Sequence, residues 1–462
     1  MINKIKFYCC LLSLIALVTC TFCSCSSSSV VPYPAPPGLT TSTDFTVQAN
    51  GTDIWVERVG GAAMEQDDSY IYHGDLEDMN IAAFSCSGPV EIKITAPSNI
   101  SKFIIKPQSR GIKAEVHGRT LSFKIPDPQK LYIEIDSLPH LAIFADPPEM
   151  NPPKQGDPGV VYFSPGRYDP DQIEIQSNQT IYIAPGAIVY ANVRGSNLQN
   201  VKITGRGMLQ GNVRISDTTN LTVDGIFIRN TQGWTNTLTN CRNSRYDNVK
   251  VFGYGSRWGL DGINPVSCRN FTIDNCFLRC RDDCVAIKSM NYALNVDSIF
   301  VSNNIMVGWA YSDGVTIGFE LNGSPVQNIF VKNCDILYAT GGGMTGGHSG
   351  FSIVCDGPAW VQNVRYEDIR IEDQVEFNNL ELIVTPGKYY GDDSPGHIKG
   401  IYMKNISYEN TEKPFIISGF SPKNRVEDIT FDNCKVGGKI LTGVNDANFQ
   451  VNEFTEGIKF IY

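Results

Sequence analysis

The sequence lacks three features that would point to common classes of protein. It has no excess of basic residues, since 38 Lys and Arg stand against 48 Asp and Glu for a formal net charge of -10. Proteins that bind nucleic acid or anionic membranes carry basic patches, so both classes are disfavoured. No apolar run after residue 25 is long enough to span a bilayer. Nine cysteines follow that point, an odd number at mostly apolar positions, which does not favour a disulfide framework.

The chain begins with a candidate targeting signal. A short apolar run, residues 11–18, follows Lys4 and Lys6 and leads into Phe22-Cys23-Ser24-Cys25. This layout is typical of a secretory signal, and the cysteine segment resembles the lipobox of bacterial lipoproteins. We predict that residues 1–25 are a lipoprotein signal peptide with Cys25 lipidated; an ordinary cleaved signal peptide is the alternative. The protein is then exported to the periplasm or outer membrane of a Gram-negative bacterium, and touches the membrane only through its lipid.

Composition divides the remaining chain into three segments. Residues 26–43 are rich in Ser, Pro and Thr with almost no charge, which predicts an extended linker. Residues 44–150 hold short β-rich runs such as Glu91-Ile-Lys-Ile94, broken by Gly, Pro and Asp turns, which is typical of an antiparallel β-sandwich. Five prolines between residues 147 and 158 mark a boundary. Residues 159–462 are therefore expected to form a second domain.

The second domain contains a repeated hexapeptide in which polar and apolar residues alternate. Examples are Asn270-Phe-Thr-Ile-Asp-Asn275 and Asn328-Ile-Phe-Val-Lys-Asn333. Eight such units follow one another at intervals of 23 to 37 residues, so a constant strand is joined by loops of variable length. The alternation indicates strands with one buried face. We predict an all-β protein in which a small β-sandwich precedes a right-handed parallel β-helix.

Two residue types recur at fixed places in these units. Asparagine ends most of them, and stacked asparagines can exchange amide hydrogen bonds as a ladder; the positions are Asn248, Asn275, Asn303, Asn333, Asn405 and Asn433. The next position holds Cys276, Cys334 and Cys434 among aliphatic residues. We interpret these cysteines as small, inward-facing apolar side chains.

A second strand of each unit begins with a carboxylate. These strands begin Asp261-Gly-Ile, Asp283-Cys-Val and Asp313-Gly-Val. In a solenoid the three stack in a column about 5 Å apart, with Asp282 beside the middle one. Repulsion in such a cluster raises the pKa of at least one carboxyl group, which leaves a proton for acid-catalysed hydrolysis of a glycosidic bond. A Ca²⁺ site and isolated loop aspartates are the alternatives.

These motifs resemble those of a known family. Trp258-Gly-Leu-Asp-Gly-Ile-Asn264 and Arg281-Asp-Asp-Cys-Val-Ala-Ile-Lys288 look like the Asn-Thr-Asp and Asp-Asp-Cys signatures of the polygalacturonase-like glycoside hydrolases of family 28, over roughly residues 166–345. The resemblance implies a pectin-lyase-like β-helix with Asp282 as general acid, while Asp261 and Asp283 activate water in an inverting reaction. The sandwich ahead of the β-helix is similar to that of the dextranase and isopullulanase family.

The sequence departs from that family where the family binds its acidic sugar. Ser312-Asp313-Gly314 stands in place of Gly-His-Gly, and the Arg-Ile-Lys of the next rung is not found. Because Asp313 would repel a galacturonate carboxylate, we expect a neutral sugar. Candidate substrate-binding residues, each with an ordinary structural role as its alternative, are Asp313, His348, Lys288, Trp258, Trp309 and Tyr311. No cofactor and no metal are expected.

Two other functions are compatible with a β-helix. A polysaccharide lyase uses Ca²⁺ and a basic residue on a uronic acid, but the aspartate column offers no obvious basic partner. A non-catalytic glycan-binding surface protein could use the solenoid as a platform, but it has no need of mutually repelling carboxylates. We therefore predict a hydrolase that acts on a polysaccharide or oligosaccharide.

Overall fold

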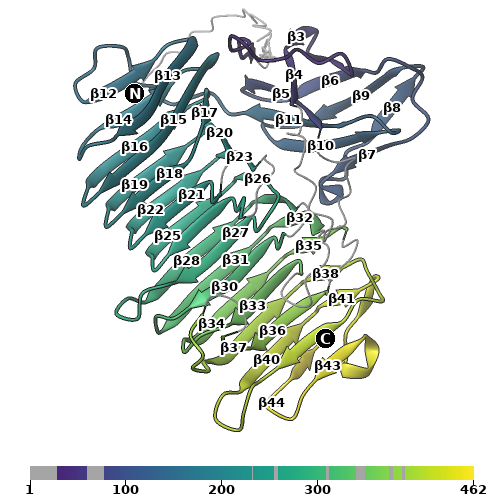
Figure 1. The fold of residues 1–462 in the computed structure, drawn as a ribbon. Helices are drawn as coiled ribbons and strands as arrows, with labels where there is room; N and C mark the ends of the chain where they lie inside the picture. The colour runs from purple at the N-terminus through teal and green to yellow at the C-terminus, as the bar shows by residue number, and fades with distance from the viewer. Residues whose placement is uncertain are drawn as a thin grey trace, which may run out of the picture.

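The computed structural model describes residues 29–59, 78–230, 233–253, 259–308, 312–339, 349–373, 378–387 and 391–462. The chain forms a small β-domain that lies against the N-terminal half of a long stack of parallel strands (Figure 1). Two short 3-10 helices, η2 (Gln108–Arg110) and η3 (Val444–Asp446), lie outside the sheets. The described segments include no helix with the length and apolarity needed to cross a membrane.

The N-terminal domain consists of two packed sheets. The first contains β1 (Val30–Pro32), β4 (Val56–Val59), β5 (Met79–Cys86), β7 (Phe103–Lys106), β10 (Lys130–Ile135) and β11 (His140–Asp146). The second contains β2 (Thr46–Ala49), β3 (Thr52–Ile54), β6 (Val90–Thr95), β8 (Ala114–His117) and β9 (Thr120–Ile125). Pairing is antiparallel as predicted, except that β5 and β11 are parallel. Alternate residues of the two sheets, such as Phe84, Ile92 and Ile133, form a common core.

The predicted linker over residues 26–43 is corrected by the structure. Within it, β1 pairs with β5 over Val30 to Pro32, and Thr41 forms an isolated bridge with Glu57. Composition indicated an unpaired chain, but the edge of β5 offers backbone partners that composition does not reveal. The sandwich therefore begins before residue 44. Residues 1–28, which include the predicted signal peptide and Cys25, lie outside the described residues.

The second domain is a right-handed parallel β-helix in which each turn contributes strands to two long sheets. The first sheet consists of β12 (Val160–Phe163), β14 (Thr180–Ile183), β16 (Gln199–Gly205), β19 (Thr219–Asp224), β22 (Arg242–Asp247), β25 (Arg269–Asp274), β28 (Val296–Ser302), β31 (Val326–Lys332), β34 (Trp360–Glu367), β37 (His397–Lys404), β40 (Val426–Asp432), β44 (Thr455–Glu456) and β45 (Lys459–Ile461). These strands run side by side in Figure 1.

Most turns of the β-helix contribute two strands to the second sheet. It consists of β13 (Gly166–Glu174), β15 (Ala187–Ser196), β17 (Met208–Gln210), β18 (Val213–Ser216), β20 (Phe227–Asn230), β21 (Asn236–Thr239), β23 (Lys250–Gly253), β24 (Ile263–Val266), β26 (Phe277–Cys280), β27 (Val285–Ser289), β29 (Ile305–Gly308), β30 (Val315–Leu321), β32 (Asp335–Ala339), β33 (Phe351–Cys355), β35 (Arg370–Ile371), β36 (Leu380–Val384), β38 (Ser407–Tyr408), β39 (Phe415–Ser418), β41 (Lys435–Val436), β42 (Lys439–Ile440) and β43 (Phe449–Val451). The strands β18, β21, β24, β27, β30, β33 and β36 lie side by side and form the face that carries the aspartates.

The predicted hexapeptides coincide with strands of the first sheet, from β19 to β40. The asparagines that end them have a left-handed backbone, for example Asn333 at φ 51°, a conformation that asparagine adopts more readily than other L-residues. The predicted ladder forms in part, because Asn333 donates to Asn303 and Asn433 donates to Asn405, both at 2.8 Å. A second ladder at the start of the units was missed; it includes Asn200, Asn220, Asn243, Asn270, Asn328 and Asn363.

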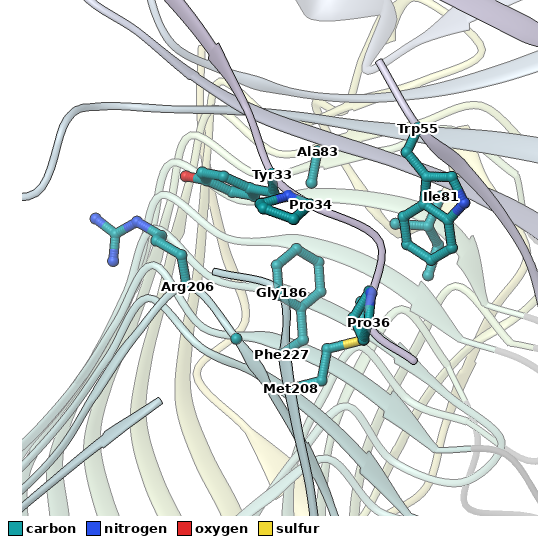
Figure 2. Close-up of a pocket in the computed structure, with 11 residues that line it drawn as sticks. Tyr33, Pro34, Pro36, Trp55, Ile81, Ala83, Gly186, Arg206, Met208 and Phe227 are labelled. Carbon is teal, nitrogen blue, oxygen red and sulfur yellow. The ribbon is translucent and has the colours of Figure 1, made fainter. Parts of the chain in front are cut away.

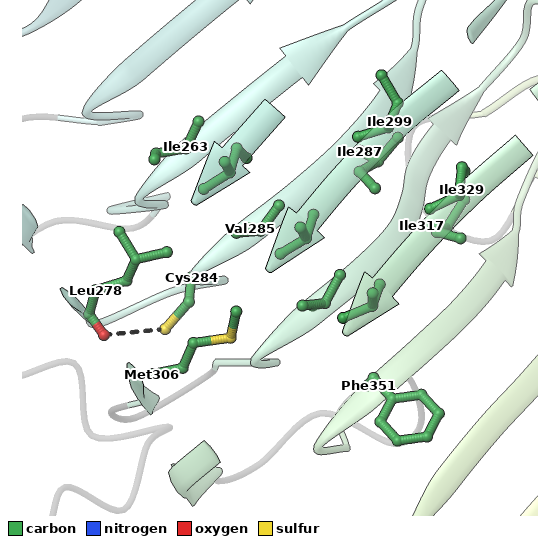
Figure 3. Close-up of a cluster of buried hydrophobic side chains, with 14 of the residues drawn as sticks. Ile263, Leu278, Cys284, Val285, Ile287, Ile299, Met306, Ile317, Ile329 and Phe351 are labelled. Atoms are coloured by element: carbon green, nitrogen blue, oxygen red, sulfur yellow. Dashed lines mark hydrogen bonds between the residues drawn. The ribbon is translucent and has the colours of Figure 1, made fainter. Parts of the chain in front are cut away.

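Stacked aliphatic side chains fill the interior of the β-helix. Figure 3 shows Ile263, Val285 and Ile317 on successive turns, and all three are buried. Cys284 lies among them and directs its thiol to the carbonyl oxygen of Leu278 at 3.5 Å. All nine cysteines of the described residues are unpaired and buried. Cys276, Cys334 and Cys434 belong to the core of the β-helix, which confirms the interpretation of these three as inward-facing apolar side chains.

Apolar and charged contacts hold the sandwich against the wall of the β-helix. Phe144 of β11 packs edge-on against Phe227, Phe252 and Phe277 of the wall. Beside it, Lys250 Nζ donates to both oxygens of the buried Asp146 at 2.6 and 2.8 Å. The pocket drawn in Figure 2 lies in this interface and has a volume of about 20 Å³. That is room for about one water molecule, so the interface has a structural role.

Candidate active site

The register of the sheet places the aspartates in a column, as the sequence predicts. Ile263 of β24 pairs with Val285 of β27, and Val285 pairs with Val315 of β30. Two residues before these, just ahead of each strand, Asp261, Asp283 and Asp313 occupy equivalent positions on three successive turns. Backbone hydrogen bonds continue the ladder to this point.

Two of the three aspartates are followed by glycine for a steric reason. A Cβ on Gly262 would lie 2.4 Å from the carbonyl oxygen of Cys284, and a Cβ on Gly314 would lie 2.7 Å from that of Gly350. The backbone thus passes so close to the next turn that a side chain does not fit. The Asp-Gly pairs therefore reflect tight packing between turns rather than isolated surface turns.

Asp282 is the aspartate that solvent can reach. Its side chain is partly exposed, whereas Asp261 and Asp283 are each only 2% exposed. Its two oxygens accept hydrogen bonds at 3.0 Å, one from the N–H of Gly259 and one from the N–H of Asp283. Burial raises the pKa of Asp282, while Lys288 and these two N–H groups oppose the increase. The carboxyl group is thus held in one orientation at a position that solvent reaches.

Asp261 lies beneath this surface and is bound by an amide and an ammonium group. Asn264 donates to its Oδ2 at 2.7 Å, and the Nζ of Lys288 lies 3.9 Å from the same oxygen. Burial, and then the charge of Asp282, raise the pKa of Asp261 to about 8. The carboxyl groups of Asp261 and Asp282 are therefore coupled, and they hold a proton near neutral pH.

Lys288 is positioned by acidic residues of later turns. Its Nζ donates to Glu320 at 2.9 Å, and the backbone N–H groups of Glu320 and Leu321 donate to Asp356 at 3.0 Å. Burial alone would lower the pKa of Lys288, but Asp261 and Glu320 outweigh burial and raise it. Lys288 is therefore a fixed cation behind the catalytic carboxylates. Its predicted contact with substrate is not supported, because the side chain is buried and paired with protein.

Asp313 supports Asp283 from the following turn. The N–H of Asp313 donates to Asp283 Oδ1 at 3.0 Å, while Ser349 N–H and Ser352 Oγ bond the two oxygens of Asp313. Burial raises the pKa of Asp313 well above its ordinary value, although these bonds oppose the increase. With 0% exposure and both oxygens engaged, Asp313 has no atom free for a sugar. The structure thus does not support its predicted contact with substrate.

Several predicted residues cannot be placed. Trp258, Trp309, Tyr311 and His348 lie outside the described residues. Instead, the structure brings Trp234 to the site, where its ring faces the Nζ of Lys288 at 4.7 Å. The roles of Asn264, Glu320 and Asp356 were not predicted from the sequence. Asn264 belongs to the motif that begins with Asp261, three positions further along the chain.

An open pocket adjoins the aspartates. It has a volume of about 430 Å³ and is lined by Arg214, Gly233, Trp234, Thr237 and Gly259. Gly259 is the residue whose N–H holds Asp282, so the pocket and the carboxylates share one wall. The arrangement can hold a sugar beside a coupled pair of carboxyl groups that shares one proton, so that one member can donate the proton while the other is ionised. Among the described residues, no group of three or more His, Cys, Asp or Glu side chains is arranged to hold a metal ion.

Comparison with known proteins decides the family. The profile of glycosyl hydrolases family 28 matches residues 166–453, which is more than half of the chain and includes every aspartate of the column. The chain belongs to this family. Family 28 proteins are glycoside hydrolases by definition, and the resemblance noted in the aspartate motifs is thus confirmed.

Individual relatives of this family 28 protein are distant. A probable exopolygalacturonase B of Emericella nidulans is 24% identical over 206 residues, which are 42% of this chain and 43% of that protein. A probable polygalacturonase of Vitis vinifera is 23% identical over 204 residues, or 43% of this chain and 32% of that protein. The chain thus spans less than half the length of these relatives. Their names are at odds with the neutral substrate expected from the sequence.

Among solved structures, Dex49A from Penicillium minioluteum has the same fold. It matches with a TM-score of 0.59 at 16% identity, and the match covers 93% of this chain and 96% of that one. Because the match covers nearly the whole of both chains, the similarity extends to the domain ahead of the β-helix as well as to the β-helix itself.

Proposed function

We propose that this family 28 protein hydrolyses O-glycosidic bonds with Asp282 as general acid, and with Asp261 and Asp283 as the groups that activate water. The observation that carries the proposal is the contrast in exposure. Asp282 is partly exposed to solvent, and the two flanking aspartates are buried beneath it with raised pKa values. A proton held by this coupled cluster is available to the leaving oxygen from Asp282, because it is the one of the three carboxyl groups that is partly exposed.

The buried pair suits the second half of the reaction. Asp261 is held by Asn264 and Lys288, and Asp283 is held by the N–H of Asp313. Their orientation is thus fixed before substrate binds, which general base catalysis requires. A water molecule held between Asp282 and this pair would attack the anomeric carbon from the opposite face to the leaving group. The expected product has inverted configuration.

We propose a uronate-containing glycan of the pectic type as substrate, in place of the neutral glycan expected from the sequence. Two observations support the change. The relatives are named as polygalacturonases. A neutral sugar was expected because an ionised Asp313 facing the substrate would repel a carboxylate, but Asp313 is buried and hydrogen bonded, and burial raises its pKa in the direction that favours the neutral form. A neutral Asp313 exerts no repulsion on a sugar carboxylate.

Purified protein tests the reaction directly. Polygalacturonate, rhamnogalacturonan, dextran and xylan are incubated with wild type and with the Asp282→Asn variant, and reducing ends are counted. Hydrolysis produces a saturated product, whereas a lyase produces an unsaturated one that absorbs in the ultraviolet. We expect saturated products from a uronate-containing glycan with wild type and almost none with the variant. Activity on dextran alone would contradict the proposed substrate, and no activity on any glycan would contradict the proposed reaction.

Export as a lipoprotein is proposed on the sequence of residues 1–25 and is tested by metabolic labelling of Cys25 with a fatty acid.

A further inference from the structure

The pocket beside the aspartates contains an arginine that the proposed mechanism does not use. Arg214 lines it together with Gly233, Trp234, Thr237 and Gly259. None of these five residues is acidic. The segments next to the pocket in sequence, residues 231–232 and 254–258, contain no Asp or Glu either.

The register fixes where Arg214 lies relative to the reaction. Arg214 of β18 pairs with Thr237 of β21, and Thr237 pairs with Asn264 of β24. Asn264 is the residue that donates to Asp261. Arg214 is therefore two turns before Asp261 and three turns before Asp282 on the same face of the sheet, a distance of about 10 to 15 Å at the strand spacing. A glycan that lies along this face with one sugar at Asp282 places a sugar further along its chain at the arginine.

The guanidinium group of Arg214 is available for a ligand. The side chain is exposed and forms no ion pair or hydrogen bond within the described part of the chain. On the preceding turn, Arg214 pairs with a second exposed arginine, Arg194. Arg194 pairs in turn with Glu174, one turn earlier. The acidic neighbour thus adjoins Arg194 and is two turns from Arg214. Two like charges stacked on adjacent strands are unfavourable for folding, which indicates a use other than stability.

We infer that Arg214 binds the carboxylate of a uronic acid residue, in a subsite two turns before Asp261 and three turns before Asp282. The guanidinium fork matches a carboxylate with two parallel hydrogen bonds. A protein with a net charge of -10 repels an anionic glycan at long range, so a local cation is needed to hold one. The floor at the catalytic turns is uncharged at Ala286, Thr316 and Ser352. Charge is therefore recognised beside the cleavage point, and the sugar cleaved there needs no carboxylate.

The inference rests on the proposed function, so binding is measured apart from turnover. In the Asp282→Asn background, calorimetry compares trigalacturonate with its carboxyl-reduced counterpart. Arg214→Gln is expected to weaken binding of trigalacturonate by about 10- to 100-fold, the range for charge-assisted hydrogen bonds. Binding of the reduced trisaccharide is expected to change little. Arg242→Gln is the matched control, because Arg242 is also exposed but belongs to β22 on the other sheet; it changes the net charge equally and is expected to leave both affinities unchanged.

The outcomes separate the two proposals. If Arg214→Gln weakens both ligands equally, or weakens trigalacturonate no more than Arg242→Gln does, the carboxylate subsite is wrong. It is equally wrong if the parent variant does not bind trigalacturonate. If Arg214-dependent binding is found but the wild-type protein cleaves no glycan, the subsite stands and the proposed hydrolysis fails. Arg214→Lys adds a further check, since a single ammonium keeps the charge but loses the fork, and affinity should fall between wild type and Gln.

Discussion

Replacing Asp282 by asparagine separates the roles of the three aspartates. The amide has the shape of the carboxyl group but cannot supply a proton, so we expect kcat on a glycan to fall by ~10² to 10⁴. At 1.36 kcal/mol per decade, that is about 3 to 5 kcal/mol of transition-state stabilisation. Because the Asp282 side chain is partly exposed, we expect the substitution to remove the proton donor without collapse of the site.

The structure also gives the cost of this substitution to folding. Asp282 accepts one N–H on each oxygen, from Gly259 and from Asp283. Asparagine has one acceptor oxygen, so one N–H loses its partner, at a cost of about 1 to 3 kcal/mol when buried. Water can replace the lost acceptor at a partly exposed site, so we expect a loss near the lower end and a decrease of a few degrees in Tm. Asp217→Asn is the control, because Asp217 is exposed with φ 49°, a conformation that asparagine adopts readily.

The assay that isolates the acid compares two leaving groups. An aryl glycoside with a nitrophenol leaving group departs without protonation, so Asp282→Asn should retain far more activity on it than on a natural glycan. Asp261→Asn, which affects the attacking water, should lose activity on both substrates. Equal losses for Asp282→Asn on the two substrates would refute its assignment as the acid.

Three further predictions follow from the carboxylate cluster. NMR of the earliest product should show inversion at the anomeric carbon, and retention would exclude the proposed placement of water. Asp313→Asn should fold and keep its turnover within about one order of magnitude, because the amide oxygen can accept from the Ser349 N–H while the amide NH2 donates to the Ser352 hydroxyl, which now donates to Asp313; a larger loss would show that Asp313 acts as an ionised group. The raised pKa of Asp261, about 8 against an ordinary 3.8, belongs to its coupled pair with Asp282, so the pair shares a proton in the folded state, and its contribution to stability falls as pH rises through this window. The Tm of Asp261→Asn relative to wild type should therefore increase from pH 4 to pH 8, and a constant difference would contradict the raised pKa.

Much of the fold could be predicted from the sequence because each turn of the β-helix repeats a local pattern. The hexapeptides gave the strands from β19 to β40, and alignment of the second strands gave the column of Asp261, Asp283 and Asp313. Pairing between adjacent turns preserves register, so a residue's place in its unit fixes its neighbours. β1 was missed because its partner, β5, lies more than 40 residues away.

The supporting residues of the site could not be predicted, because irregular backbone positions them. Glu320 reaches Lys288 from a strand whose register shifts after Ile317, and Glu320 itself has φ 62°. Asp356 holds this irregular backbone through two N–H groups from 36 residues away. No repeat pattern predicts such a departure. The expectation for Asp313 failed for a related reason, since a sequence gives the sign of a potential charge but not the burial that suppresses it.

The division of labour between turns explains how one scaffold can keep its chemistry while its substrate changes. Asp261, Lys288 and Glu320 are linked across three successive turns by buried hydrogen bonds and ion pairs, so a change at any of them alters the others. Arg214 is at least two turns away from each of them, is exposed, and forms no hydrogen bond or ion pair with any of them. Distant sites without shared partners change independently. Substitution at the Arg214 turn can therefore alter which sugar is bound while the pKa values of the aspartates, and with them the reaction, stay the same.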